Sequence, residues 1–208
     1  MRVIVGDDLA ELAASWIAAR SRQHERFAIS LAGGSTPRAV YERLASMELA
    51  WESWYVWWGD ERMVAADHDD SNERMAREAW LDHVPIPESQ ITPLRSLNTP
   101  LPARFQLILL GIGTDGHTAS LFPGDAGLEA SDPIVQVERS DHPRLSLTFP
   151  VLNAAECVAF LASGEGKREM LARVVGGDQT LPAARVHAAE TVVLADAAAA
   201  GGHEEGSC

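Results

Sequence analysis

The chain has 208 residues, of which 17 are Lys or Arg and 30 are Asp or Glu, so its formal net charge is −13. Nucleic acids and anionic membranes bind proteins through a net basic surface, and this acidic balance argues against both as partners. Hydrophobic residues make up 46% and charged residues 23%, which is typical of a folded domain and argues against a disordered chain.

Apolar runs and helical periodicities alternate along the chain. The apolar runs predict strands at residues 2–5, 27–32, 54–58, 105–110, 145–149, 158–161 and 191–194. Helices are predicted at residues 9–22, 37–47, 72–83 and 164–175. Asp7 or Asp8 can cap the first helix, and Ser71 or Asn72 the third.

Several of these strands are continuously apolar, which is typical of a parallel sheet covered on both faces. The sequence therefore predicts an α/β fold with a single doubly wound, mostly parallel sheet and helices on both faces. We expect this domain to occupy residues 1–195. Residues 196–208 are small, polar and acidic, and we expect them to form a disordered tail.

Cysteine content and the N-terminal segment bear on the compartment. Two cysteines cannot make a disulfide framework or a four-cysteine zinc site. Residues 1–6 lack the apolar core of a signal peptide, and no run reaches the roughly 18 apolar residues that span a bilayer. We therefore expect a cytoplasmic protein with reduced thiols.

Polar residues follow three of the predicted strands, at 33–36, 59–62 and 111–117. In open parallel sheets, ligands bind at the carboxyl ends of the strands. If the three strands are neighbours, these three loops converge on a single cleft.

The first loop reads Gly33-Gly34-Ser35-Thr36 and leads into a helix. The glycines let the backbone approach a ligand, and the hydroxyls and the helix N-terminus can bind an anion such as phosphate. The loop lacks the lysine of a nucleotide P-loop. A tight strand-to-helix turn with a serine cap is the alternative interpretation.

The third loop fits the G-x-G-x-x-G pattern of dinucleotide-binding folds between Gly111 and Gly116. Pro123 would break the helix that such a fold needs next, and Asp115 would repel a pyrophosphate, so we discount this interpretation. His117 follows the loop directly. Histidine is the side chain best suited to moving protons near neutral pH, and Asp115 can orient it.

Charged residues supply the remaining candidates. Arg62 can bind an anion or polarise a carbonyl and Asp60 can hold a sugar hydroxyl, although a charged surface turn is the alternative. Lys167 is the only lysine, and all the other basic residues counted above are arginines. It lies at a predicted helix start, where a cation is unfavourable unless an anionic ligand binds there, or its position is chance. The segment 67–70, Asp-His-Asp-Asp, reads as a solvated loop, so no metal site is expected.

Together these motifs resemble the 6-phosphogluconolactonase family, within a group of sugar-phosphate isomerase-like, modified Rossmann folds that includes glucosamine-6-phosphate deaminases. The resemblance rests on residues 30–37 (SLAGGSTP), 58–62 (WGDER), 70–72, 110–124 (LGIGTDGHTASLFPG), 144–153, 164–167 and 181–184. It covers nearly the whole chain. Relatives carry a longer, helical segment where this chain has only the short, proline-rich residues 93–104.

The resemblance implies hydrolysis of 6-phospho-D-glucono-1,5-lactone to 6-phosphogluconate, in the oxidative branch of the pentose phosphate pathway, without metal or organic cofactor. His117 would be the general base, oriented by Asp115. Lys167, Arg62 and the 33–36 loop would surround the sugar-phosphate lactone. A monomer or a weak homodimer is expected.

Two other functions stay open from the sequence. A deaminase or isomerase acting on an amino-sugar phosphate is the first, but that branch carries a glutamate where this chain has Phe122. A non-catalytic sugar-phosphate-binding protein is the second, and it would not need His117.

Overall fold

The computed structural model describes residues 1–202, and its centre is a six-stranded sheet. All neighbouring strands in this sheet are parallel, as the apolar runs predicted. Their order across the sheet is β1 (Arg2–Gly6), β9 (Glu190–Asp196), β8 (Cys157–Ala162), β5 (Leu107–Gly111), β2 (Phe27–Leu31) and β3 (Trp54–Trp58). The predicted α/β class is confirmed.

A second, three-stranded sheet is antiparallel and was not predicted. Its order is β4 (Asp60–Arg62), β7 (Arg144–Leu147) and β6 (Ile134–Val137). Only β7 corresponds to a predicted strand, and that strand ends earlier than expected because Phe149 begins the short helix α4 (Phe149–Ala154). Every residue of β4 is charged, so pairing with β7 rather than local propensity makes it a strand.

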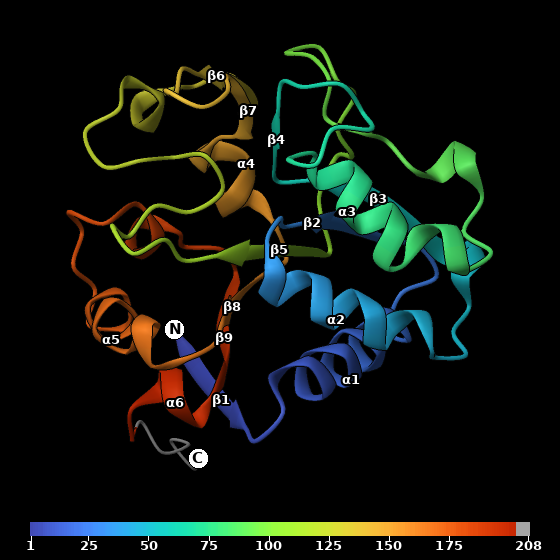
Figure 1. Ribbon diagram of the computed structural model, residues 1–208, viewed down its shortest axis with the longest axis horizontal. Helices are drawn as coiled ribbons and strands as arrows, with labels where there is room; N and C mark the ends of the chain where they lie inside the picture. The colour runs from blue at the N-terminus through green and yellow to red at the C-terminus, as the bar shows by residue number, and fades with distance from the viewer. Residues whose placement is uncertain (203–208) are drawn as a thin grey trace.

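Helices cover the large sheet on both sides. Figure 1 shows α1 (Leu9–Ser21), α2 (Ser35–Ala45) and α3 (Asn72–Ala79) grouped in the right half of the view, with α5 (Arg168–Val175) and α6 (Ala197–Ala200) in the left half. The caps are Asp8 for α1 and Ser71 for α3, since each side chain accepts a backbone N–H three residues on, at 3.1 Å. None of the helices formed by residues 1–202 is long and apolar enough to cross a membrane.

A cluster of aromatic rings fills the core beneath α2 and α3. Trp54, Trp80 and Phe27 are at most 1% exposed, and Trp54 meets the other two rings edge-on. Tyr41 stacks on Trp80 from α2. Its hydroxyl also bonds both the N–H and the C=O of Ala32 at 2.9 Å, so the core anchors the residue that follows β2.

Residues 93–104 contain no helix or strand, in keeping with the short segment seen in the sequence. The stretch nevertheless covers the outer edge of β3. Thr92, directly before the stretch, donates its N–H to the Val56 carbonyl. Within the stretch, the Pro100 carbonyl accepts from Trp57 Nε1 at 2.9 Å, and Leu94 is buried. An irregular loop thus protects an edge strand that would otherwise offer unpaired backbone groups to another chain.

The expectation of a tail from residue 196 needs correction over its first part. Asp196 ends β9 and caps α6, in which Ala199 and Ala200 are buried. Small side chains that look like a tail in the sequence are here small enough to pack against α5 and the sheet. The remainder of that expectation, residues 203–208, lies outside the described residues.

Candidate active site

A cavity of about 400 Å³ opens where β2, β3 and β5 end, as expected for a parallel sheet. Its wall includes eight of the nine predicted site residues: Gly33, Gly34, Ser35, Thr36, Asp60, Arg62, His117 and Lys167. The ninth, Asp115, touches the site through its bond to His117. The three loops that the sequence placed at strand ends therefore converge, as predicted.

The 33–36 loop presents a helix N-terminus to this cavity. Gly34 has φ 104°, a conformation that favours glycine, and α2 begins at Ser35 without a side-chain cap. The first N–H groups of α2 are therefore available to an anion. Gly33 is needed for a different reason from Gly34, because a Cβ at position 33 would collide with the Asn72 side chain.

His117 and Asp115 form a hydrogen-bonded pair. His117 Nδ1 lies 2.6 Å from Asp115 Oδ1, which also accepts the His117 backbone N–H at 3.1 Å. Burial alone would raise the pKa of Asp115, but the hydrogen bonds from His117 lower it below the ordinary aspartate range. A carboxylate only accepts hydrogen bonds, so the proton of a neutral imidazole sits on Nδ1 and Nε2 keeps a free lone pair.

The chain after His117 is held in an unusual conformation. Ala119 has φ 47° and is the one non-glycine residue within positions 1–202 with positive φ. On either side of it, Thr118 Oγ1 donates to the Gly111 carbonyl, and the Ser120 hydroxyl donates to Asp60 Oδ2 at 2.6 Å. These bonds tie the loop to β5 and β4. Strain of this kind persists only where the surroundings over-determine it, and it clusters at functional sites.

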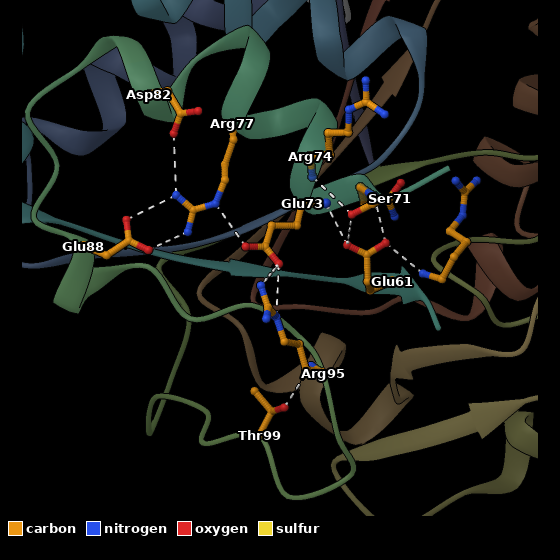
Figure 2. Close-up of polar contacts among 11 residues, drawn as sticks. Glu61, Ser71, Glu73, Arg74, Arg77, Asp82, Glu88, Arg95 and Thr99 are labelled. Atoms are coloured by element: carbon orange, nitrogen blue, oxygen red, sulfur yellow. Dashed lines mark hydrogen bonds and ion pairs between the residues drawn. The ribbon is translucent and has the colours of Figure 1, made fainter. Parts of the chain in front are cut away.

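Glu61 is buried between β4 and α3 and positions its two neighbours (Figure 2). Its carboxylate accepts backbone N–H groups from Arg62, Asn72 and Glu73 at 2.7–2.8 Å, and the Ser71 hydroxyl at 3.3 Å. Burial raises the pKa of Glu61 above the ordinary glutamate value, although the three N–H groups oppose this. The side chain thus satisfies the start of α3 and orients β4, which carries Asp60 and Arg62.

Glu61→Gln should therefore destabilise the fold. In either orientation the amide NH2 would face a backbone N–H, leaving buried donors unpaired, at a cost of about 1–3 kcal/mol. Denaturant unfolding measures the change. Glu25→Gln is the matched control, because Glu25 is exposed and a surface change there should stay within about 0.5 kcal/mol. Equal stability of the two variants would contradict this role for Glu61.

Three cations and a single carboxylate line the cavity. Arg62 and Arg144 are directly paired across β4 and β7, and Lys167 comes from the loop before α5. Like charges placed opposite each other on two strands repel. In a chain of net charge −13, this local excess of positive charge indicates a site for an anion.

Lys167 reaches the cavity from a turn that side-chain hydrogen bonds hold in place. Its Nζ donates to the Ile112 carbonyl at 2.8 Å, which uses one of its three protons and leaves two for a ligand. Asp196 holds the turn before it, accepting the Gly164 N–H and the Ser163 hydroxyl. The residue with which the expected tail began therefore helps to position Lys167.

Comparison with known proteins agrees with this geometry. A model of the family described as glucosamine-6-phosphate isomerases/6-phosphogluconolactonase matches residues 4–194. The chain belongs to this family. A protein from Nostoc sp. named 6-phosphogluconolactonase is 43% identical over 74% of this chain and 73% of its own length. One of the same name from Synechocystis sp. is 44% identical over 70% of each. The solved structure of 6-phosphogluconolactonase from Thermotoga maritima superposes with a TM-score of 0.84, at 28% identity over 94% of this chain and 99% of that one.

Two wall residues of this family member were not singled out from its sequence. Arg144 and Asn72 fall inside segments that carried the resemblance, but neither has a local pattern that suggests a ligand contact. The pairing of β7 with β4 brings Arg144 to Arg62. Asn72 donates its side-chain N–H to the Asp60 carbonyl at 2.9 Å, so it fastens α3 to β4. Both residues reach the cavity wall only through contacts between segments that are distant in the sequence.

Proposed function

We propose that the protein hydrolyses 6-phospho-D-glucono-1,5-lactone to 6-phosphogluconate, with His117 as general base. The observation that carries this proposal is the His117–Asp115 pair at a cavity with three cations. The names of the two cyanobacterial relatives and of the Thermotoga maritima structure support the same activity.

The chemistry follows from the proton positions. His117 Nε2 takes a proton from water while the water oxygen adds to the lactone carbonyl carbon. The tetrahedral intermediate carries negative charge on the former carbonyl oxygen, and we assign its stabilisation to Arg62, which lines the cavity. Breaking the bond between the carbonyl carbon and the ring oxygen then gives the carboxylic acid. The imidazolium returns its proton to the departing ring oxygen, and Asp115 stabilises the positive charge in between.

The phosphate group of the substrate needs its own binding residues. Lys167 has two unused protons, and Gly33, Gly34, Ser35 and Thr36 present the N-terminus of α2 to the same cavity. We assign the phosphate to Lys167 with the support of this loop. Asp60 has one carboxylate oxygen bound to Ser120, and its Oδ1 accepts no hydrogen bond within residues 1–202, so it can accept one from a sugar hydroxyl.

Phe122 argues against deaminase or isomerase chemistry. Its ring packs on His117 at 4.3 Å between ring centroids, and the Arg139 guanidinium carbon lies 3.4 Å from the centroid of the Phe122 ring. The position at which the deaminase branch carries a glutamate is thus an apolar ring against the base. Without that carboxylate, the proton transfers of an aldose–ketose isomerisation lack their second group.

The decisive assay uses freshly prepared 6-phosphogluconolactone, with correction for spontaneous hydrolysis. We expect rapid enzyme-dependent release of 6-phosphogluconate, and no ammonia or fructose 6-phosphate from glucosamine 6-phosphate. Tight binding of 6-phosphogluconate without turnover would instead favour a non-catalytic sugar-phosphate-binding protein.

Replacing Arg62 should separate charge from geometry. Arg62→Ala should lower kcat/KM, because the group that stabilises the oxyanion is lost. Arg62→Lys should be nearly as poor if the planar guanidinium is needed, since Nη1 is already fixed by the Asp70 carbonyl at 2.6 Å. Steady-state kinetics of both variants measure this. Unchanged kinetics in both would make Arg62 a surface residue.

Chelators should leave the lactonase activity intact. The proposed proton transfers run through His117 and Asp115, and no step calls for a metal ion. The measurement is kcat/KM before and after dialysis against EDTA. A loss of activity that a divalent ion restores would contradict the proposed mechanism.

A further inference from the structure

Two histidines and an aspartate from distant segments meet beside the active-site rim. One ring nitrogen each of His68 and His142 and a carboxylate oxygen of Asp70 all lie within 4.8 Å of one another. His142 Nε2 is 3.1 Å from Asp70 Oδ2, and His68 Nδ1 is 3.8 Å from the same oxygen. The sequence places His142 more than 70 residues from the other two, so the segment 67–70 looked like a solvated loop.

Hydrogen bonds hold the segments that carry this cluster, and one of them runs from the Asp70 N–H to His68 Nδ1 at 3.1 Å, which leaves His68 Nε2 without this bond. His142 lies two residues before Arg144, which pairs with Arg62 across β7 and β4. Met63 donates its N–H to the Pro143 carbonyl at 2.8 Å, and Arg62 Nη1 donates to the Asp70 carbonyl. The loops that carry the cluster are therefore fixed at both ends, so a ligand would not have to order them.

The surrounding charges leave Asp70 free for such a ligand. Its neighbour Asp69 is paired with Arg74, and Asp141 is paired with Arg144 at 2.6 Å. Within residues 1–202, the carboxylate of Asp70 has imidazoles as its only charged or chargeable partners. All three side chains are partly exposed, so an ion and its remaining water ligands can reach them.

We propose that His68, Asp70 and His142 form a binding site for a divalent transition metal of the zinc class. Two imidazoles and a carboxylate suit Zn²⁺, whereas Mg²⁺ and Ca²⁺ prefer oxygen ligands alone. Tetrahedral zinc needs ligand atoms about 3.4 Å apart, so the exposed rings must close by little more than 1 Å. The site has three protein ligands and room for water. It takes no part in proton transfer by His117, and the loop that holds Arg62 is fixed without it by hydrogen bonds of Arg62 and Met63.

Calorimetric titration of the full-length, metal-free protein with Zn²⁺ tests the site. We expect one high-affinity ion per chain, a higher Tm when zinc is bound, and no comparable binding of Mg²⁺. Titration with Co²⁺ should add a visible absorption band from bound imidazole and carboxylate ligands.

His68→Ala and His142→Ala should each weaken zinc binding at least about 10–100-fold, since even the loss of an outer partner of a metal ligand costs that much. His187→Ala is the matched control, because His187 is exposed and outside the cluster, and it should bind zinc as the unchanged protein does. The variants keep His203 and Cys208, which could also bind zinc. Undiminished affinity in both cluster variants, or no high-affinity ion in the unchanged protein, would overturn the proposal. Circular dichroism without metal verifies that each variant folds.

Discussion

His117→Ala should lower kcat for 6-phosphogluconolactone by about 10²–10⁴-fold, the usual contribution of a positioned general base. The groups to which we assign substrate binding, Lys167, Arg62 and the 33–36 loop, stay in place, so KM should change much less. Single-turnover and steady-state kinetics with the lactone measure both constants. Binding of 6-phosphogluconate should survive, because His117 is placed to move protons and not to hold the phosphate.

Asp115→Asn is the companion variant. An asparagine carbonyl oxygen can still accept both His117 N–H groups, but it carries no negative charge to stabilise the imidazolium that forms when His117 takes a proton. We therefore expect Asp115→Asn to lose kcat as well, although the imidazole is present. If His117→Ala kept a near-normal kcat, His117 would not be the base, whatever the behaviour of the asparagine variant.

Loss of Lys167 should raise KM for the phosphorylated lactone roughly 10–100-fold, the worth of a hydrogen bond between charged groups. Lys167→Ala leaves the Ile112 carbonyl without its donor but leaves His117 and Asp115 in place. Its defect should be far smaller with glucono-1,5-lactone, because the missing contact is made only to the phosphate. Equal defects with the two lactones would remove Lys167 from the phosphate site.

Chemical modification gives an independent test of the same residue. Lys167 is the only lysine, so amine-selective acylation reaches just Lys167 and the N-terminal amine. Acylation should abolish the charge of Lys167 and lower activity, and saturating 6-phosphogluconate should slow the loss. Lys167→Ala still carries the N-terminal amine and is the control, since acylation should leave its residual activity unchanged. Fully acylated protein with the unmodified rate would contradict the assignment.

The local sequence pattern was sufficient to predict the strands whose residues are buried on both faces of the sheet. The runs at β3, β5 and β8 are continuously apolar and β2 is interrupted only by Ser30, and burial on both faces of a parallel sheet follows from that pattern. The loops after β2, β3 and β5 could be located for the same reason, because glycines and polar residues end each run. His117 and Asp115 are two residues apart, so their contact needs only a tight turn.

Elements with weak local preference depended on the tertiary structure. β4 consists of Asp60, Glu61 and Arg62, and it becomes a strand only because β7 supplies backbone partners. Asp196 looked like the start of a tail, yet its carboxylate caps α6 and holds the turn before Lys167. A short alanine run has no periodicity that would reveal the surface against which it packs.

The sequence by itself determined the sheet, the three loops at its carboxyl edge and the His117–Asp115 pair, since each rests on burial or on contacts between near neighbours in the chain. Only the tertiary structure decided which side chains from distant segments lie beside these loops. Arg144 reaches Arg62, and His142 reaches His68 and Asp70, through strand pairing between segments some 80 residues apart. Such contacts leave no local trace, because each partner alone looks like an ordinary solvated side chain.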